Sequence, residues 1–156
     1  MPNYRRIEGG GLDASDRRLI EALDRNARTS TADLARLIGL SAQSTSDRLK
    51  RLEDIGVITA FTLRLDPVAL GLPIGAYIRI RPAMGELSRV ASLLANIPEI
   101  IECDRITGED CFIAKVQVSQ IEQLERVIDQ LLPYAQTNTS IIQSSPVPRR
   151  QPPFAR

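Results

Sequence analysis

Apolar residues recur at helical spacing over the first third of the chain and predict three short helices. The first begins near Asp13, whose carboxylate can cap the free N–H groups of the opening turn, and Asp16 adds negative charge that the helix dipole favours. The second opens at Ser30 in a pattern close to a capping box, and Ser41 caps the third, which runs to about Ile55. The inward-facing positions are Leu19, Ile20, Leu23 and Ala27, then Leu34, Ala35 and Ile38, and finally Ala42, Thr45, Leu49 and Leu52.

The joint between the second and third helices is the tight turn Gly39-Leu40-Ser41, in which glycine takes the left-handed conformation and Leu40 plugs the core. After the third helix, residues 57–65 are rich in β-formers and predict the strands of a wing, which Asp66-Pro67 ends. Three helices followed by a wing predict a winged helix-turn-helix over residues 12–66. A flexible arm, residues 1–11, precedes it.

The pattern changes to strict alternation at Ile74 and then switches between strand and helix periods. The resulting order β-α-β-β-α-β predicts a ferredoxin-like second domain over residues 74–145, joined by a linker at 67–73 and followed by a basic, Pro-rich tail at 146–156. The fold class is therefore α+β. The predicted strands are 74–81, 99–106, 111–118 and 137–144, and the first predicted helix is 87–97. A Ser119–Glu122 capping box opens the second helix, whose inward-facing residues are Ile121, Leu124, Val127, Ile128 and Leu131.

Composition narrows the function without naming it. The net charge is only +1, and residues 12–66 hold nine basic and nine acidic side chains, so any attraction for nucleic acid must be local. No apolar run approaches the roughly 18 residues that span a bilayer, and the start of the chain lacks a signal-peptide pattern, which favours a cytoplasmic protein. The chain has no histidine, which removes the commonest general base. Its two cysteines match no zinc spacing, so reduced structural thiols are expected.

The third helix carries the best candidate for chemistry, because its polar side is the surface that a recognition helix presents to the major groove. Gln43 has the amide geometry to pair with adenine, and Arg48 or Arg51 could bind guanine or phosphate. The alternative is an ordinary solvated face with an Asp47–Arg51 ion pair. The preceding turn and the following wing favour double-stranded DNA as the partner. The candidate DNA-binding residues are Ser41, Gln43, Ser44, Asp47, Arg48, Lys50 and Arg51.

In the second domain, the turn at 107–110 has the features of a ligand-binding loop, because glycine allows close approach and free amides suit a carboxylate. A plain hairpin turn is the alternative. The acidic residues Glu102, Asp104, Glu109 and Asp110 lack the regular spacing of a cation site, so a solvated acidic turn is expected there.

The chain resembles the Lrp/AsnC (feast/famine) family of transcriptional regulators from about Leu12 to Val147. The motifs that carry the resemblance are Leu12-Asp13-Ala14-Ser15-Asp16, Asp33-Leu34-Ala35 with Gly39-Leu40-Ser41, the run from Arg48 to Ile58, Ile101-Glu102-Cys103, and Ile106-Thr107-Gly108-Glu109-Asp110-Cys111-Phe112.

The resemblance implies a DNA-binding regulator whose second domain dimerises through its sheet, builds tetramers, octamers or similar assemblies, and responds to a small effector, often an amino acid. It implies neither a cofactor nor a metal. Many members have aspartate where this chain has Cys111, and Asp110 cannot simply replace it, since adjacent strand residues face opposite ways. The implied effector-binding residues are Thr107, Gly108, Glu109, Asp110, Cys111, Thr139 and Ser140.

Two other functions compete with DNA-binding regulation. Some proteins of this build act as sirohaem decarboxylases, a chemistry that depends on histidine, and this chain has none, so we expect no enzyme. A metabolite-sensing module without DNA binding is the second alternative. The basic cluster Arg48, Lys50 and Arg51 argues against it.

Overall fold

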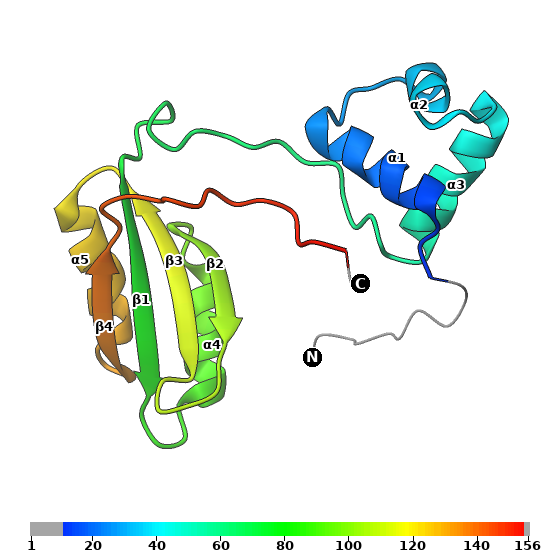
Figure 1. Cartoon of the computed structure of the whole chain (residues 1–156). Helices are drawn as coiled ribbons and strands as arrows, with labels where there is room; N and C mark the ends of the chain where they lie inside the picture. Colours follow the sequence, from blue (N-terminus) through cyan, green and yellow to red (C-terminus); the bar gives the residue numbers. More distant parts are fainter. Residues whose placement is uncertain (1–10, 155–156) are drawn as a thin grey trace. The chain divides into compact units, whose positions relative to one another are not determined.

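The computed structural model describes residues 11–154, which form two compact units (Figure 1). Among the described residues, unit 1 is 11–63 together with 149–154, and unit 2 is Arg64–Pro148. Residues 1–10 of the predicted arm, and Ala155 and Arg156 of the predicted tail, lie outside the described residues.

Unit 1 contains three helices, α1 (Ala14–Arg25), α2 (Thr31–Ile38) and α3 (Ala42–Asp54). Each follows its predicted cap: the side chains of Asp13, Ser30 and Ser41 accept hydrogen bonds from N–H groups of the first turn. Gly39 ends α2 at a φ of 75°, the left-handed conformation that a tight turn into α3 requires. The predicted helix-turn-helix is confirmed.

The core of unit 1 is small. It consists of the buried side chains of Leu19, Leu23, Leu34, Ile38 and Leu52, with a ring of partly buried apolar residues around them. Two positions predicted to face inward, Ala27 and Ala42, are exposed instead. Ala27 lies beyond the end of α1 and Ala42 is the first residue of α3, so neither lies over the packed middle of a helix.

The expected wing strands at residues 57–65 do not form, and this detail of the prediction is wrong for the single chain. The segment is β-rich in composition, but none of the strands in the described chain pairs with it. A β-strand is stabilised by hydrogen bonds to a neighbouring strand. Without that neighbour, water satisfies the backbone N–H and C=O groups in any conformation, so an extended one has no advantage. The apolar side chains of Phe61 and Leu63 are consequently exposed.

Unit 2 is one four-stranded antiparallel sheet with two helices. Its strand order is β2-β3-β1-β4, so that β1 and β2, joined through a helix, flank β3 between them (Figure 1). This is the predicted split β-α-β arrangement of a ferredoxin-like domain. The elements are β1 (Ile74–Pro82), α4 (Leu87–Asn96), β2 (Ile100–Arg105), β3 (Phe112–Val118), α5 (Ile121–Leu131) and β4 (Ala135–Ile141).

The core of unit 2 lies between the sheet and both helices. Ile78 and Ile80 of β1, Val90 of α4 and Leu131 of α5 are among its fully buried side chains. Alternate residues of β1 are exposed because they point to the other face of the sheet, which no helix of the described chain covers.

Helix α5 departs from the sequence prediction at its start. The expected Ser119–Glu122 capping box is absent: Gln120 is the N-cap residue and makes no side-chain cap, while the Ser119 N–H donates to Oε1 of Gln123 at 3.0 Å. Ile121, predicted to be inside, is 42% exposed. The Gln123 side chain accepts the hydrogen bond from the Ser119 N–H that the predicted capping box assigned to Glu122. The N-cap residue is accordingly Gln120, one position after the predicted Ser119.

Candidate functional site

Helix α3 is held by its own N-terminal cap. The Ser41 hydroxyl accepts from the Ser44 N–H at 3.1 Å, and the buried Thr45 hydroxyl donates to the Ser41 carbonyl at 2.9 Å. The buried Thr45 and Leu52 therefore mark the inner side of the helix. Of the residues predicted to bind DNA, Ser41, Gln43, Asp47 and Lys50 are exposed, and Ser44, Arg48 and Arg51 are half-buried.

The exposed side of α3 carries a hydrogen-bonded pair one helical turn apart. Nε2 of Gln43 donates to Oδ1 of Asp47 at 3.0 Å. The Asp47–Arg51 pair of the alternative interpretation is not formed, because Arg51 binds a carboxylate of another helix. The contact orients the Gln43 amide while leaving its oxygen free. Separately, Lys50 has no ionic partner among the described residues.

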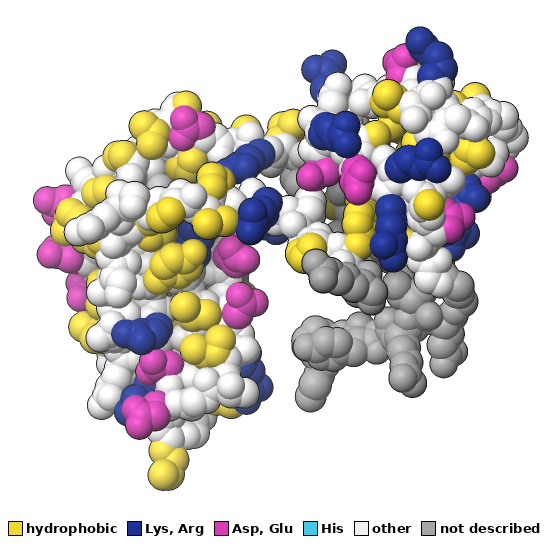
Figure 2. Space-filling model, viewed as in Figure 1, with side chains coloured by type: hydrophobic (Ala, Val, Ile, Leu, Met, Phe, Trp, Pro, Cys, Tyr) yellow, Lys and Arg dark blue, Asp and Glu magenta, His cyan; other side chains and the backbone are white. Residues whose placement is uncertain are grey.

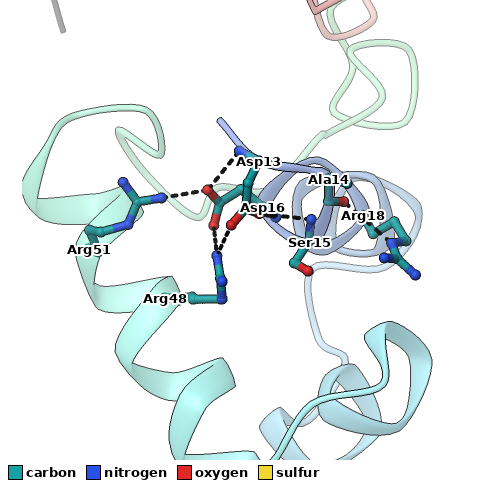
Figure 3. A network of polar contacts seen from close by, with 7 residues as sticks. All are labelled: Asp13, Ala14, Ser15, Asp16, Arg18, Arg48 and Arg51. Carbon is teal, nitrogen blue, oxygen red and sulfur yellow. Dashed lines mark hydrogen bonds and ion pairs between the residues drawn. The ribbon is translucent and has the colours of Figure 1, made fainter. Parts of the chain in front are cut away.

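Arg48 and Arg51 reach from α3 to the start of α1 (Figure 3). Nη1 of Arg48 lies 2.9 Å from Oδ1 of Asp16 and 2.7 Å from Oδ2 of Asp13. Nη2 of Arg51 lies 2.5 Å from Oδ2 of Asp16. The Asp16 side chain is fully buried, and its Oδ2 also accepts from the Asp13 N–H at 3.2 Å, which completes a capping box.

This ion-pair network affects the charge of its members. The Asp16 N–H and the Arg48 guanidinium, in that order, lower the pKa of the Asp13 carboxyl from its ordinary value. Hydrogen bonds to Asp13 and then to Asp16 raise the pKa of Arg48. Asp13 and Arg48 therefore both stay ionised at neutral pH. Sequence reasoning assigned only capping and dipole roles to the two aspartates, although an acid three residues after an acidic cap is itself the spacing of a capping box.

The network borders a surface depression between the starts of α1 and α3, into which Ser41, Gln43, Ser44 and Asp47 also face. Its ionisable residues are Asp13, Asp16, Asp47, Arg48 and Arg51, three acids against two bases. Figure 2 shows the same mixture more widely, with acidic and basic side chains interspersed over the visible face of the helical unit. A single basic surface is therefore not what this unit presents to a partner.

In unit 2, the turn between β2 and β3 meets the end of β1. The Cys111 N–H donates to the Ile80 carbonyl at 3.0 Å, and the Ile106 N–H donates to the Cys111 carbonyl at 2.9 Å. Residues 107–110 project from this anchored base, with Gly108 at a φ of 115° that side-chain-bearing residues rarely adopt.

The acids of this turn pair with arginines of β1 that sequence reasoning did not include. Nη2 of Arg81 lies 2.6 Å from Oε2 of Glu109, and Asp110 lies within 4.0 Å of Arg79 and 3.7 Å of Arg81. Nη2 of Arg79 also donates to Oδ1 of Asn138 on β4 at 3.0 Å. The alternation of β1 was the available signal, since it places Arg79 and Arg81 together on the uncovered face of the sheet.

The other proposed effector residues divide between the two faces. Thr139 pairs with the buried Ile78 and Ser140 with the exposed Tyr77, so Thr139 points to the helix side and Ser140 to the uncovered side. Similarly, Cys111 packs against the core of unit 2. Asp110 instead faces the arginines, and thus does not occupy the position of Cys111. The structure brings Glu109 and Asp110 together with Arg79 and Arg81 of β1, whereas Thr139 points to the other face of the sheet.

The described residues contain neither a metal-binding cluster nor a membrane-spanning helix. Within 11–154, no three side chains among the Cys, Asp and Glu residues gather closely enough to hold a metal ion. Over that range no helix combines the length and the apolar character needed to cross a bilayer. Both cysteines are free thiols, and partial burial raises the pKa of Cys103.

Comparisons with known proteins cover both units. Residues 12–59 match the family model for winged helix-turn-helix DNA-binding and residues 75–152 match the model for the Lrp/AsnC ligand binding domain. The chain is 35% identical over 131 residues to the HTH-type transcriptional regulator LrpC of Bacillus subtilis, covering 84% of this chain and 91% of LrpC.

Solved structures agree in fold along nearly the whole chain. The structure of B. subtilis LrpC has a TM-score of 0.83 at 34% identity, covering 87% of this chain and 97% of that chain. The feast or famine regulatory protein of Mycobacterium tuberculosis complexed with L-methionine has a TM-score of 0.83 at 28% identity, covering 90% of this chain and 98% of that chain.

Proposed function

Because the chain belongs to the Lrp/AsnC family of transcriptional regulators, we propose that α3 of unit 1 reads a specific DNA sequence and that unit 2 makes this binding responsive to a small amino-acid effector. The chain is a DNA-binding transcriptional regulator with an Lrp/AsnC ligand-binding domain, and its family consists of regulators rather than enzymes. What the proposal adds is the assignment of each step to particular residues.

The observation that carries the DNA-binding assignment is the position of α3. It follows directly on the Gly39 turn, its inner side is fixed by Thr45 and Leu52, and its N-terminal end presents Gln43 and Asp47 outward. The N-terminal residues of a recognition helix are those that lie nearest the base edges. We assign base contacts to Gln43, Ser44 and Asp47, and phosphate contacts to Ser41 and Lys50, with Arg48 and Arg51 at the edge of the same surface.

Replacing Gln43 by alanine tests this assignment. A glutamine amide that pairs with adenine contributes about 1–3 kcal/mol of discrimination, so Gln43→Ala should lose roughly 5- to 150-fold in affinity for a selected duplex and lose its preference at one base pair. The measurement is fluorescence anisotropy with a duplex selected by the wild-type protein from a random-sequence pool and with single-base variants of that duplex. Gln130→Ala, an exposed glutamine of α5, is the control and should bind as the wild type does.

We also propose that the effector binds at the β2–β3 turn. The free amides of residues 107–110 suit a carboxylate, and the adjacent carboxylates of Glu109 and Asp110 suit an ammonium group. The turn lies beside Arg79 and Arg81, whose pairing with these acids keeps the local charge balanced and suits a zwitterion better than a net-charged ligand. The methionine complex of the M. tuberculosis relative supports an amino acid as the ligand class.

Asp110→Asn is the variant that separates effector response from DNA binding. Asp110 lies 3.7 Å or more from the arginines, so its loss should leave the fold intact. An allosteric effector typically changes affinity 5- to 150-fold, and in Asp110→Asn this ratio should fall toward 1 while effector-free DNA affinity is unchanged. The ratio is measured by titrating L-methionine, and then each other amino acid, into the protein–DNA complex. Asp129→Asn on α5 is the control; an undiminished response in Asp110→Asn would remove the turn from the effector site.

We further propose that the protein binds DNA as a homodimer. Phe61 and Leu63 stand two positions apart in the β-rich segment after α3 and are 51% and 83% exposed. Alternate residues of a paired strand share one side, so a partner strand on this apolar edge, Phe61 and Leu63, would cover both. The sheet face carrying the exposed Tyr77 and Ser140 is likewise uncovered by any helix of the described chain. A second copy, which the family resemblance implies, would cover both surfaces, and assembly of dimers into tetramers or octamers stays a prediction.

A further inference from the structure

The ion-pair network that joins α1 to α3 restrains two arginines of the recognition helix, Arg48 and Arg51. Asp16 is fully buried, and both of its oxygens are occupied, Oδ1 by Arg48 and Oδ2 by Arg51 and the Asp13 N–H. A buried carboxylate left without its partners is strongly unfavourable, so both arginines are needed where they are. Neither guanidinium can turn away from α1 to meet DNA without removing a partner from this buried carboxylate.

The local charge also argues against phosphate contacts by these arginines. The depression beside them contains three carboxylates, those of Asp13, Asp16 and Asp47, against the two guanidinium groups. A net-negative depression does not provide the charge neutralisation and counterion release from which affinity for the DNA backbone comes, so the phosphate contact assigned to Ser41 is an uncharged hydrogen bond. By contrast, Lys50, between the two arginines in sequence, is exposed and lacks an ionic partner among the described residues.

The geometry of the network restricts how α3 can move. The paired residues lie 32 and 35 positions apart in sequence, so the contacts join the start of α1 to the middle and the last turn of α3. They come from successive turns of α3, with Arg48 and Arg51 both directed at one carboxylate (Figure 3). Two such contacts on one side of a helix resist rotation about its axis. That rotation would carry Gln43 and Asp47 out of register with the bases.

We propose that Asp16 is a positioning residue for DNA recognition: through Arg48 and Arg51 it fixes the rotation of α3, and these arginines neither bind phosphate nor read bases. This inference rests on the proposed function, since it presupposes that α3 is the recognition helix. It replaces the direct DNA-binding role that the sequence predicted for Arg48 and Arg51. Specificity then depends on Gln43, Ser44 and Asp47 and on the network that aims them.

Three matched variants, Arg48→Gln, Arg51→Gln and Lys50→Gln, test the proposal in the full-length protein. Each removes one positive charge and replaces it with a shorter, uncharged polar amide. Affinity for a duplex selected by the wild type and for an unselected duplex of equal length is measured over a series of salt concentrations. Each phosphate contact contributes about 0.9 to the slope of log K against log salt.

The expected results differ between the positions. Lys50→Gln should reduce the salt slope by about 0.9 and weaken both duplexes equally, as a phosphate contact does. Arg48→Gln and Arg51→Gln should leave the slope unchanged while the ratio of selected to unselected affinity falls, roughly 5-fold or more. Slopes that fall by about 0.9 in both arginine variants would overturn the proposal, because the arginines would then be phosphate contacts.

Two further measurements keep the test decisive. Amide hydrogen exchange in α1 and α3 reports whether the arginine variants fold. If they do not, Asp13→Asn, which alters a half-exposed member of the network, should lower the selected-to-unselected ratio at unchanged slope, and a wild-type ratio would overturn the proposal. Failure of the wild-type protein to select any sequence would contradict the proposed function instead, so the two failures are distinguishable.

Discussion

Leu52→Ala is expected to unfold the helices of unit 1 while the sheet of unit 2 stays folded. Leu52 is fully buried in a core of only five buried apolar side chains, and its truncation leaves a cavity that costs about 2–5 kcal/mol. Small domains have little stability to lose, since about 5–15 kcal/mol is typical of whole proteins. Hydrogen exchange should therefore show loss of protection in α1–α3 alone, and specific DNA binding should disappear.

The control for this prediction is Leu37→Ala. Leu37 lies on α2 and is 66% exposed, so the same chemical change removes little buried surface and should leave both protection and DNA binding unchanged. Equal effects of the two substitutions would mean that unit 1 is not organised around the Leu52 core. Simultaneous loss of protection in β1–β4 would mean that the two units unfold as one.

Local signals in the sequence predicted the fold well because each helix start and strand period depends on nearby residues. The caps at Asp13, Ser30 and Ser41, the stop at Gly39 and the alternation of β1 are confirmed. One error lies where two nearby side chains can make the same hydrogen bond. Gln123 accepts from the Ser119 N–H in place of the predicted Glu122, and α5 begins one residue later than predicted.

The candidate site shows where local reasoning stops. Periodicity placed Arg48 and Arg51 on the polar side of α3, but their partners lie on another helix 32 and 35 residues away. Nothing in the spacing along α3 indicates that Asp16 is buried, because burial of a charge depends on tertiary packing that supplies its counterions. Likewise, Arg79 and Arg81 reach the turn at residues 107–110, the proposed effector site, only through the pairing of β1 with β3.

Residues 57–65 present the sharpest conflict between local propensity and the single chain. Their composition predicts strands, yet the described chain offers them no hydrogen-bonding neighbour. Two partners would resolve the conflict: the same segment of a second copy, or DNA lying against a wing. Both would cover the exposed apolar side chains of Phe61 and Leu63, so exposure alone does not separate them.

Leu63→Asp separates them, and its expected effect is large. Leu63 is 83% exposed, so a charge there costs the folded chain little, but it would be buried in a dimer that packs on this edge. We expect sedimentation equilibrium to show the 17.3 kDa monomer in place of a dimer. Affinity for a two-half-site duplex should fall about 10²- to 10⁴-fold, because two linked recognition helices bind with a high effective concentration and one does not.

Thr62→Asp is the matched control, since it places the same charge on the adjacent, exposed residue, whose side chain points to the opposite side of an extended segment. It should remain dimeric and bind DNA with a loss no greater than one added phosphate repulsion produces. If Leu63→Asp stays dimeric but loses DNA affinity at a single half-site as well, the segment is a DNA-contacting wing and the dimer forms through the sheet face alone. If half-site affinity is unchanged and only two-half-site binding is lost, the tightness of recognition in this regulator comes from pairing two copies, as the balanced charge of residues 12–66 requires.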